Sequence, residues 1–443
     1  MSAIARLKEH PTGFWYIFWG ELAERASFYG MRTVLALYMT DVLLFEQDNG
    51  AAIMHAFIAA CYVAPLLGGW LADRVLGRYK TILYFSGPYI LGHIILGGME
   101  NRTGLFIALV LLALGSGSIK PNTSTLMGQM YEEQKKSALL TEAFSYFYAA
   151  INVGSAIATL ALPAIRNSVR DSTGSLERGY AVALMIPAAL MVLAFGFFAI
   201  GKKHYPVEHV RDLPPKTPEQ RAAERATLTR VSGLFALIAV FWFVYDQSAS
   251  TWIYFAKDHM DLHLFGGLST TPDQIQGLNP VLIVVLTPIF NTLWETLKRR
   301  RGGVDVPDTR KMLLGFFIVV ACMGLMSAVG YAAGAGKVTV WWMCLATLVI
   351  TLSELCISVV GLEFAFKVAA PGTKSVVTAA FLFTVFGGDL IAGVFDKELW
   401  NHVSAGSFFA IQTAIVAVAA LLFIVVARRF EQPTPSSNSP ATA

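Results

Sequence analysis

The sequence predicts an all-α protein that crosses a lipid bilayer many times. Three observations predict this class: 55% of the 443 residues are hydrophobic, only 14% are charged, and apolar residues come in runs of about 20, the length of a membrane-spanning helix. Soluble domains carry about 25% charged residues. The net charge of +4 indicates loops facing anionic lipid rather than a nucleic-acid surface, so we expect the lipid bilayer and no nucleic acid as partner.

Twelve apolar runs are long enough to cross a bilayer, and a polar stretch divides them into two groups of six. We predict helices over residues 14–40, 52–73, 79–98, 104–127, 138–163, 180–201, 229–256, 274–297, 311–331, 338–369, 374–396 and 404–428. The chain then has four parts: an N-terminal six-helix bundle (1–201), a cytoplasmic linker (202–228), a C-terminal six-helix bundle (229–430) and a disordered tail (431–443).

Basic residues in the loops predict the orientation. One set of alternating loops carries 24 of the 34 lysines and arginines and the other set carries seven. The positive-inside rule therefore places both termini in the cytoplasm. The predicted outer loop over 164–179 holds three arginines and departs from this pattern. The remaining cations, Arg25, Arg32 and Lys120, fall inside predicted helices.

Four charged residues interrupt the first predicted helix, in the sequence WGELAERASFYGMR. Glu21, Glu24, Arg25 and Arg32 follow the i, i+3 and i+4 spacing of one helix face. They form a polar stripe about 16 Å long, given the rise per residue of a helix. A charge at mid-bilayer costs roughly 2.5–3.5 kcal/mol. We therefore expect this face to line a cavity or to meet another helix.

The fourth predicted helix carries one cation, Lys120, in the sequence ALGSGSIKPNTSTLMG. The small residues before it allow a neighbouring helix to approach closely. A lone lysine in the membrane needs an acidic partner, and Lys120 would balance the two glutamates and one arginine at positions 21, 24 and 25. A structural ion-pair cluster is the alternative, but buried ion pairs stabilise poorly. Burial favours a neutral carboxyl group and nearby cations favour a charged one, so we favour a site that exchanges a proton when its neighbours change.

The second half of the chain also holds acids inside predicted helices. Asp246 and Glu354 are the main candidates, and Asp389 is a weaker one. Arg32 and Asp246 fall at compatible depths, so we expect a bridge that ties the two halves together on the external side. His55 opens the second helix and either relays protons at an outer vestibule or is an ordinary interfacial histidine.

Other functional classes lack support in the sequence. The four cysteines lie in apolar segments without the spacing of metal ligands, at Cys61, Cys322, Cys344 and Cys356. We expect them to pack as small apolar side chains, and we predict no metal site. The sequence shows no nucleophile–base motif, so we do not expect an enzyme.

Several motifs resemble those of the proton-dependent oligopeptide transporter (POT) family of the major facilitator superfamily. ELAERASFYG resembles the family's first-helix motif E-x-x-E-R-F-x-Y-Y-G, and GSGSIKPN resembles its fourth-helix motif G-T-G-x-x-K-P-N. FVYDQSAS resembles the seventh-helix F-E-Q element, and GGWLADRVLGRYKT resembles the superfamily's loop between the second and third helices. The resemblance implies a major-facilitator fold of twelve helices in a plasma membrane, such as a bacterial inner membrane.

The resemblance also implies a function and a partner. The chain would be a monomer that imports di- and tripeptides with protons, driven by the proton gradient and without a cofactor. Glu21, Glu24, Arg25 and Lys120 match the proton-coupling cluster, and His55 matches a histidine found in some members.

The resemblance implies binding and gating residues as well. Arg32 and Lys120 would hold the peptide carboxylate, while Glu354, Asn152 and Asn279 would hold the amine. Tyr29, Tyr62, Ser358 and Phe381 match other cavity positions. Asp246 matches the acid that pairs with Arg32 at an outer gate, and the cytoplasmic loop motif would form a charge relay with Asp73, Arg74 and Arg78. Cationic residues on one half and an acid on the other suit a zwitterionic peptide that binds through its carboxylate and its amine.

The chain departs from the family pattern at five positions. Ala26 replaces Phe, Phe28 replaces the first Tyr, Asp246 replaces Glu, Val359 replaces Pro and Phe381 replaces Trp. These changes leave the peptide preference open. The rival function is a proton-coupled carrier of another small solute, such as nitrate, a nucleoside or a drug. That carrier would keep the coupling cluster but would not need Glu354. A membrane enzyme or peptide receptor is the third class.

Overall fold

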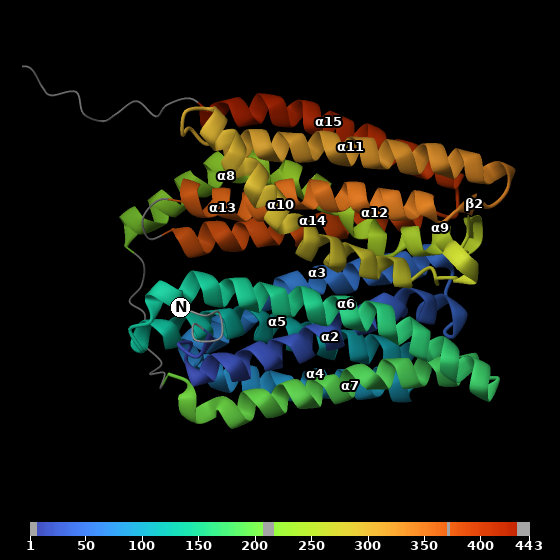
Figure 1. The fold of residues 1–443 in the computed structure, drawn as a ribbon, viewed down its shortest axis with the longest axis horizontal. Coiled ribbons are helices and arrows are strands. Elements are labelled where there is room, and N and C mark those ends of the chain that lie inside the picture. Colours follow the sequence, from blue (N-terminus) through green and yellow to red (C-terminus); the bar gives the residue numbers. More distant parts are fainter. Residues whose placement is uncertain (1–6, 207–216, 370–372, 432–443) are drawn as a thin grey trace, which may run out of the picture.

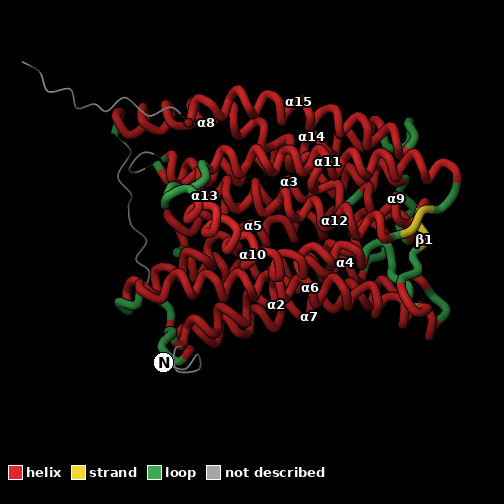
Figure 2. The backbone as a smooth tube through the Cα atoms, turned by 45° about the horizontal axis from the view of Figure 1, so that its top comes forward, coloured by secondary structure: helices red, strands yellow, loops and turns green. Residues whose placement is uncertain are grey.

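The protein consists of long helices that lie side by side, as the computed structural model shows for residues 7–206, 217–369 and 373–431 (Figure 1). The two short strands in the described part, β1 (Met260–Asp261) and β2 (Val338–Thr339), pair in parallel. They lie at the end of the molecule opposite to the start of the first helix (Figures 1 and 2). The last helix ends on the same side as the first helix starts (Figure 1), in agreement with two termini on one side of the membrane.

Six long helices form the first bundle. They are α2 (Thr12–Asp41), α3 (Gln47–Leu71), α4 (Arg78–Gly98), α5 (Arg102–Glu133), α6 (Leu140–Thr173) and α7 (Leu176–Ile200). Within it α2 packs against α6 and α7, and α5 packs against α3 and α4. The first bundle thus packs around α2, the helix that carries the buried residues Glu21, Glu24 and Arg25.

The second bundle follows after residues 207–216. Its helices are α8 (Pro218–Tyr245), α9 (Thr251–His259), α10 (Leu278–Arg300), α11 (Asp308–Ala332), α12 (Trp341–Glu354), α13 (Val360–Val368), α14 (Lys374–Leu399) and α15 (Ala405–Glu431). The two bundles meet where α14 packs along α3 and where α10 packs along α6. This seam positions the functional site.

The prediction of twelve membrane crossings is confirmed. In the described part, eleven helical stretches are long and apolar enough to cross a membrane. The twelfth crossing is α2, which is 30 residues long and carries Glu21, Glu24, Arg25 and Arg32 in its interior. Residues 432–443 of the predicted tail and 207–216 of the predicted linker lie outside the described residues. We keep the division at residues 202–228 as a proposal, and note that α8 already starts at Pro218.

The prediction of a continuous seventh helix over 229–256 is wrong in one respect, because the structure breaks this helix in two. α8 ends at Tyr245, a short 3-10 turn covers Asp246–Ala249, and α9 starts at Thr251. Ser250 between them has φ −135° and ψ −93°, which is not helical. The polar side chains of this break bond to other helices rather than to solvent, and polar residues that bond elsewhere compete with regular helix geometry. The break therefore lies at the seam between the two bundles.

The tenth predicted helix also contains an irregular turn. A π-helical turn over Leu355–Val359 separates α12 from α13. Turns of this kind widen a helix locally and occur often at functional sites. The turn begins directly after Glu354, so the irregular backbone lies beside that carboxylate.

The predicted close approach at the fourth helix is present. A Cβ on Gly117 would lie 2.4 Å from Ala64 Cβ, and a Cβ on Gly68 would lie 2.4 Å from Ser118 Cα. Both distances are shorter than real side chains allow, so only glycine fits there. The resulting contact of α3 and α5 holds Lys120 beside Tyr62, with the ammonium 5.1 Å from the ring centroid.

Candidate functional site

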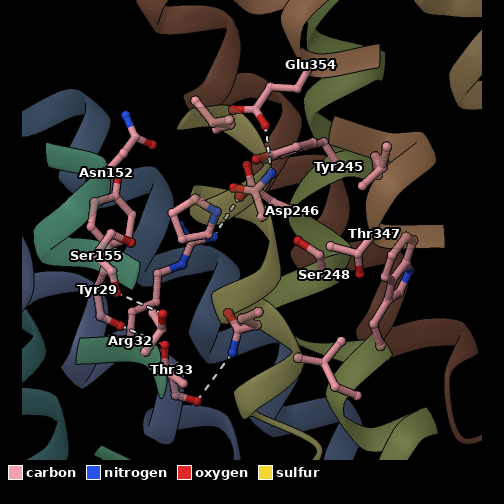
Figure 3. Close-up of a pocket in the computed structure, with 18 of the residues that line it drawn as sticks. Tyr29, Arg32, Thr33, Asn152, Ser155, Tyr245, Asp246, Ser248, Thr347 and Glu354 are labelled. Atoms are coloured by element: carbon pink, nitrogen blue, oxygen red, sulfur yellow. Dashed lines mark hydrogen bonds and ion pairs between the residues drawn. The ribbon is translucent and has the colours of Figure 1, made fainter. Parts of the chain in front are cut away.

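A cavity of about 320 Å³ lies between the two bundles. This volume is within the usual range for small-molecule sites. Ten residues singled out from the sequence line it: Arg25, Tyr29, Arg32, Tyr62, Lys120, Asn152, Asp246, Asn279, Glu354 and Ser358. The first five come from α2, α3 and α5, and Asn152 comes from α6. The other four come from the turn after α8, from α10, from α12 and from the π-helical turn after it, so eight elements on both sides of the seam contribute side chains. Figure 3 shows part of this wall.

The charges on the two walls of this cavity differ. The first bundle contributes three cations, Arg25, Arg32 and Lys120. The second bundle contributes the carboxylates of Asp246 and Glu354. Asp246 neutralises Arg32, and Glu21 and Glu24 pair with Arg25 from behind the wall, which leaves Lys120 on the first wall and Glu354 on the second. A molecule with one anionic and one cationic end is the complement of such walls.

Glu354 is held in place by a neighbouring helix. The amide of Asn279 on α10 donates hydrogen bonds to Glu354 Oε2 at 2.9 Å and to Thr351 Oγ1 at 3.0 Å. The carboxylate therefore projects from the end of α12 with one oxygen fixed. Its position beside the π-helical turn places it on the cavity wall (Figure 3).

The expected bridge between Arg32 and Asp246 is present. Arg32 donates to Asp246 Oδ1 at 2.7 Å, and only 16% of the Arg32 side chain is exposed. Asp246 reaches Arg32 because α8 ends at Tyr245 and the following turn directs the carboxylate toward α2 (Figure 3). One bond thus joins the first bundle to the second at the cavity.

The cluster of Glu21, Glu24 and Arg25 lies behind the cavity wall. Arg25 Nε donates to Glu21 Oε1 at 2.8 Å and lies 2.6 Å from Glu24 Oε2. The hydroxyl of Tyr89 on α4 donates to Glu24 Oε1 at 3.0 Å. All three charged side chains are almost fully buried. Only Arg25 of the three lines the central cavity, whereas the two glutamates line a smaller cavity inside the first bundle.

The expectation that Lys120 pairs with these glutamates is wrong for this structure. Among the described residues Lys120 makes no ion pair within 4 Å. Its ammonium lies over Tyr62 instead, because the tight contact of α5 with α3 directs the side chain into the cavity. Lys120 is therefore a cation of the cavity wall rather than a member of the cluster.

One prediction placed His55 at an outer vestibule, where it would relay protons. The structure instead buries its side chain fully between the bundles. Its Nδ1 lies 2.7 Å from Asp389 Oδ1, and its Nε2 lies 2.9 Å from Ser250 Oγ and 3.2 Å from Asp396 Oδ2. Asp396 also accepts from Gln247 at 2.8 Å. The sequence reading missed Asp396, although Asp389 and Asp396 are seven residues apart and so share one helix face.

Phe381 was predicted to line the cavity, and this prediction is wrong. The ring is 2% exposed and packs edge-on against Phe235 of α8 at 5.7 Å between centroids. A Cβ on Gly361 would lie 2.6 Å from it. Phe381 therefore fills the interior of the second bundle, because that face of α14 meets α8 and α13.

The predicted charge relay in the cytoplasmic loop is present in part. Arg78 donates to Asp73 Oδ1 at 2.9 Å, and both side chains are partly exposed. Gly77 between them has φ 76°, a conformation that favours glycine. Arg74 makes no ion pair in the described part of the chain.

Further polar contacts join the bundles on the outer side, and the sequence reading missed them. Arg166 and Asp273 form a buried ion pair, Lys257 pairs with Asp41, and Lys397 lies 2.6 Å from Asp48. Arg166 was assigned to an outer loop, but it lies on α6 and is 4% exposed. No spacing reveals these pairs, because each one joins residues more than 100 positions apart. The cavity wall also holds Tyr148, Trp242, Tyr245 and Thr347, which were not singled out as site residues from the sequence.

Comparisons with known proteins agree with this architecture. The sequence profile of the POT family (PTR2) matches residues 79–217 and 211–405. Solute carrier family 15 member 2 of Mus musculus is 35% identical over 362 residues, which cover 72% of this chain and 48% of that protein. Peptide transporter family 1 of Drosophila melanogaster is 32% identical over 375 residues, with 76% and 48% covered. The chain thus spans about half the length of these relatives.

Solved structures show the same fold. The crystal structure of the POT family transporter PepTSo has a TM-score of 0.81 and 27% identity, covering 95% of this chain and 99% of that one. An auto-inhibited POT family peptide transporter has a TM-score of 0.80 and 25% identity, with 97% and 99% covered. The predicted all-α, twelve-helix fold is therefore confirmed, and the chain is a multi-pass membrane protein that belongs to the POT family.

Proposed function

We propose that this chain is a symporter that imports di- and tripeptides together with protons by alternating access. One observation carries the proposal: a single cavity between two bundles has Arg25 and Lys120 on one wall and Glu354 on the other. Relatives whose names describe peptide transporters support the choice of substrate. A peptide carboxylate would bind at the cationic wall and a peptide amine at Glu354.

Arg25 would connect peptide binding to the proton. It lines the cavity and also contacts Glu21 and Glu24 behind the wall. When one glutamate takes up a proton, Arg25 loses a counter-charge and becomes available to a peptide carboxylate. When the proton leaves, the glutamate competes for Arg25 again, and the peptide is released. Binding and proton uptake would thus favour each other, as a linked pair of equilibria requires.

The outer contacts would close the cavity to the outside in the state described. Arg32–Asp246, Arg166–Asp273, Lys257–Asp41 and Lys397–Asp48 all join the two bundles on that side. Peptide entry from outside would require these pairs to separate as one bundle rotates against the other. The buried contact of His55 with Asp389 and Asp396 would have to separate in the same motion, which gives His55 a place in proton coupling.

Further parts of the proposal concern the setting of the protein. We place it in the plasma membrane, as in a bacterial inner membrane, and take it to act as a monomer. The proton gradient would supply the energy, with no cofactor. The six-helix halves over 1–201 and 229–430 would be its two moving parts, joined by the linker over 202–228.

The test is uptake of a labelled dipeptide by the purified protein in liposomes, with and without an inside-alkaline pH gradient. We expect accumulation only with the gradient, and competition by unlabelled di- and tripeptides. Uptake that ignores the gradient would remove proton coupling. Competition by nitrate, a nucleoside or a drug, but not by peptides, would favour the rival carrier.

A matched pair of variants sharpens this test. Glu354→Gln removes the charge proposed to hold the amine, while Glu363→Gln makes the same change on an exposed side chain that pairs with Lys367. We expect the first to lower dipeptide affinity about tenfold or more, since a hydrogen bond to a charged group contributes about 1.5–3 kcal/mol. The second should leave affinity unchanged. Equal affinities in the two variants would argue against the peptide assignment.

A further inference from the structure

A second, smaller cavity lies inside the first bundle, beside the turns of α2 that carry Glu21 and Glu24. Its volume is about 20 Å³, and Glu21 and Glu24 form part of its wall. Neither glutamate lines the central cavity, whereas Arg25 does. The acids and the base of one cluster therefore face different cavities. This separation needs an explanation if the glutamates exchange protons.

The small cavity suits one water molecule. A cavity holds a water when it offers roughly 10–15 Å³ and two to four polar partners. Besides the two carboxylates, its wall contains the hydroxyls of Ser86 on α4 and Thr123 on α5. These hydroxyls donate to their own helices, at Ile82 O and Ile119 O, so each can still accept a hydrogen bond from a water.

One carboxylate oxygen in this wall lacks a hydrogen bond. Glu24 is 2% exposed, and among the described residues no donor in hydrogen-bonding geometry reaches its Oε2. Arg25 Nε lies 2.6 Å from that oxygen but directs its bond to Glu21. The Arg25 charge stabilises this oxygen, which still has lone pairs for a further donor. A water in the cavity would donate to Glu24 Oε2 and to Ser86 or Thr123.

An aromatic stack closes the cavity toward the cytoplasm. Phe198, near the end of α7, lines the cavity. Its ring stacks on Tyr79 at 5.3 Å and on Tyr205 at 5.0 Å between centroids. Tyr79 is the second residue of α4 and Tyr205 follows α7, so the three rings lie at the cytoplasmic end of the bundle.

We propose that Glu21 and Glu24 release their proton to the cytoplasm through a water bound in this small cavity, and not through the peptide cavity. The protonated carboxyl donates its proton to the bound water; once the three rings part and cytoplasmic solvent reaches this water, the water passes one of its own protons to that solvent. The carboxyl becomes a carboxylate and the water is unchanged. Arg25 and Tyr89 contact these carboxylates directly. Ser86 and Thr123 face them across the small cavity. This inference rests on the proposed function and adds a route to it.

Two kinds of variant test the route without touching the peptide site. Thr123→Val combined with Ser86→Ala removes both hydroxyls at nearly constant volume. Gly20→Ala adds a methyl group to the cavity wall, where its nearest neighbours would be 3.5 Å and 3.9 Å away, so it fits without a clash. Gly196→Ala is the matched control, since a Cβ there meets nothing within 4 Å and the residue lies outside the cavity.

Two assays separate proton release from peptide binding. Gradient-driven dipeptide accumulation needs proton release, whereas counterflow exchange at equal pH does not. In the first two variants we expect accumulation to slow about tenfold or more, since a positioned proton-transfer group contributes on the order of 10²–10⁴-fold. Exchange should stay near the wild-type rate. Accumulation should also slow more in D₂O than it does in the wild type, a response that a packing defect does not produce.

The outcomes distinguish this inference from the proposed function. Wild-type protein that fails to accumulate dipeptide defeats the proposed function. If the wild type, the cavity variants and Gly196→Ala all accumulate dipeptide equally fast, only the proposed proton route through the small cavity is overturned. Equal loss of accumulation and exchange in the cavity variants also overturns it, because the cavity would then matter for folding or binding rather than for proton release.

Discussion

Two buried charge clusters lie in this protein, and they are built in opposite ways. The first, Glu21 with Glu24 and Arg25, belongs to a single helix. The second joins His55 of α3 to Asp389 and Asp396 of α14, and so spans both bundles. A cluster on one helix moves as a unit, so only a proton or a ligand changes it. A cluster across the seam must come apart when the bundles move. The first is therefore suited to sensing a proton, and the second to holding the outer side closed.

The largest expected effect is on stability, from Arg25→Met. Removing the one cation leaves two carboxylates uncompensated inside the first bundle, and breaking a buried ion pair costs about 3–5 kcal/mol. We expect a clear fall in the thermal unfolding midpoint of the purified protein in detergent. Lys120→Met is the control, because Lys120 lines the cavity and makes no ion pair in the described part. Equal unfolding midpoints for the two variants would contradict the view that Arg25 belongs to the buried cluster and Lys120 only to the cavity wall.

His55→Ala should act on conformation more than on stability. Asp389 and Asp396 would lose their shared partner, and they can relieve their burial by separation of the bundles, so we expect a shift of about 2 kcal/mol toward outer opening, in the range of ordinary conformational equilibria. Spin labels at the exposed positions Leu44 and Leu268, which are 73% and 69% exposed, measure this opening as a longer distance. Removing one of the two carboxylates with Asp396→Asn in the same chain should reverse part of the shift. An unchanged distance distribution would remove the closing role from the second cluster.

Lys120→Ala should weaken dipeptide binding and leave stability nearly unchanged. Lys120 faces the cavity beside Tyr62, and losing a charged hydrogen bond costs about 1.5 kcal/mol or more, which is about tenfold in affinity. Calorimetric titration with a dipeptide measures the change. Unaltered affinity would exclude Lys120 from the proposed carboxylate site and return it to the first cluster.

The smallest effect is expected for Phe381→Leu, on the same helix as the second cluster. The ring packs inside the second bundle against Phe235 and Gly361, and apolar exchanges that nearly conserve volume cost less than about 1.5 kcal/mol. Dipeptide affinity and the distance between the outer labels should both equal the wild type. A change in affinity would place Phe381 in the cavity after all, and a change in distance would show that α14 responds to more than its acids.

The sequence alone determined the fold and the first cluster. Apolar runs of spanning length predict twelve crossings, and the structure has them. The spacing of Glu21, Glu24 and Arg25 places them within reach of one another on one helix, because side chains three and four residues apart are neighbours. The motifs in α2 and α5 indicated the family that the comparisons show.

Only the tertiary structure decided which distant residues meet and which way the helices face. His55 and Asp389 are 334 positions apart, and neither Asp396 nor the Arg166–Asp273 pair had a signal in spacing. The break at Asp246 and the inward direction of Phe381 were likewise invisible. The physical reason is that faces of a membrane helix that meet lipid and faces that meet protein are both apolar, so hydrophobicity marks a crossing but not its rotation. That rotation follows from packing against partners that lie far away in the chain.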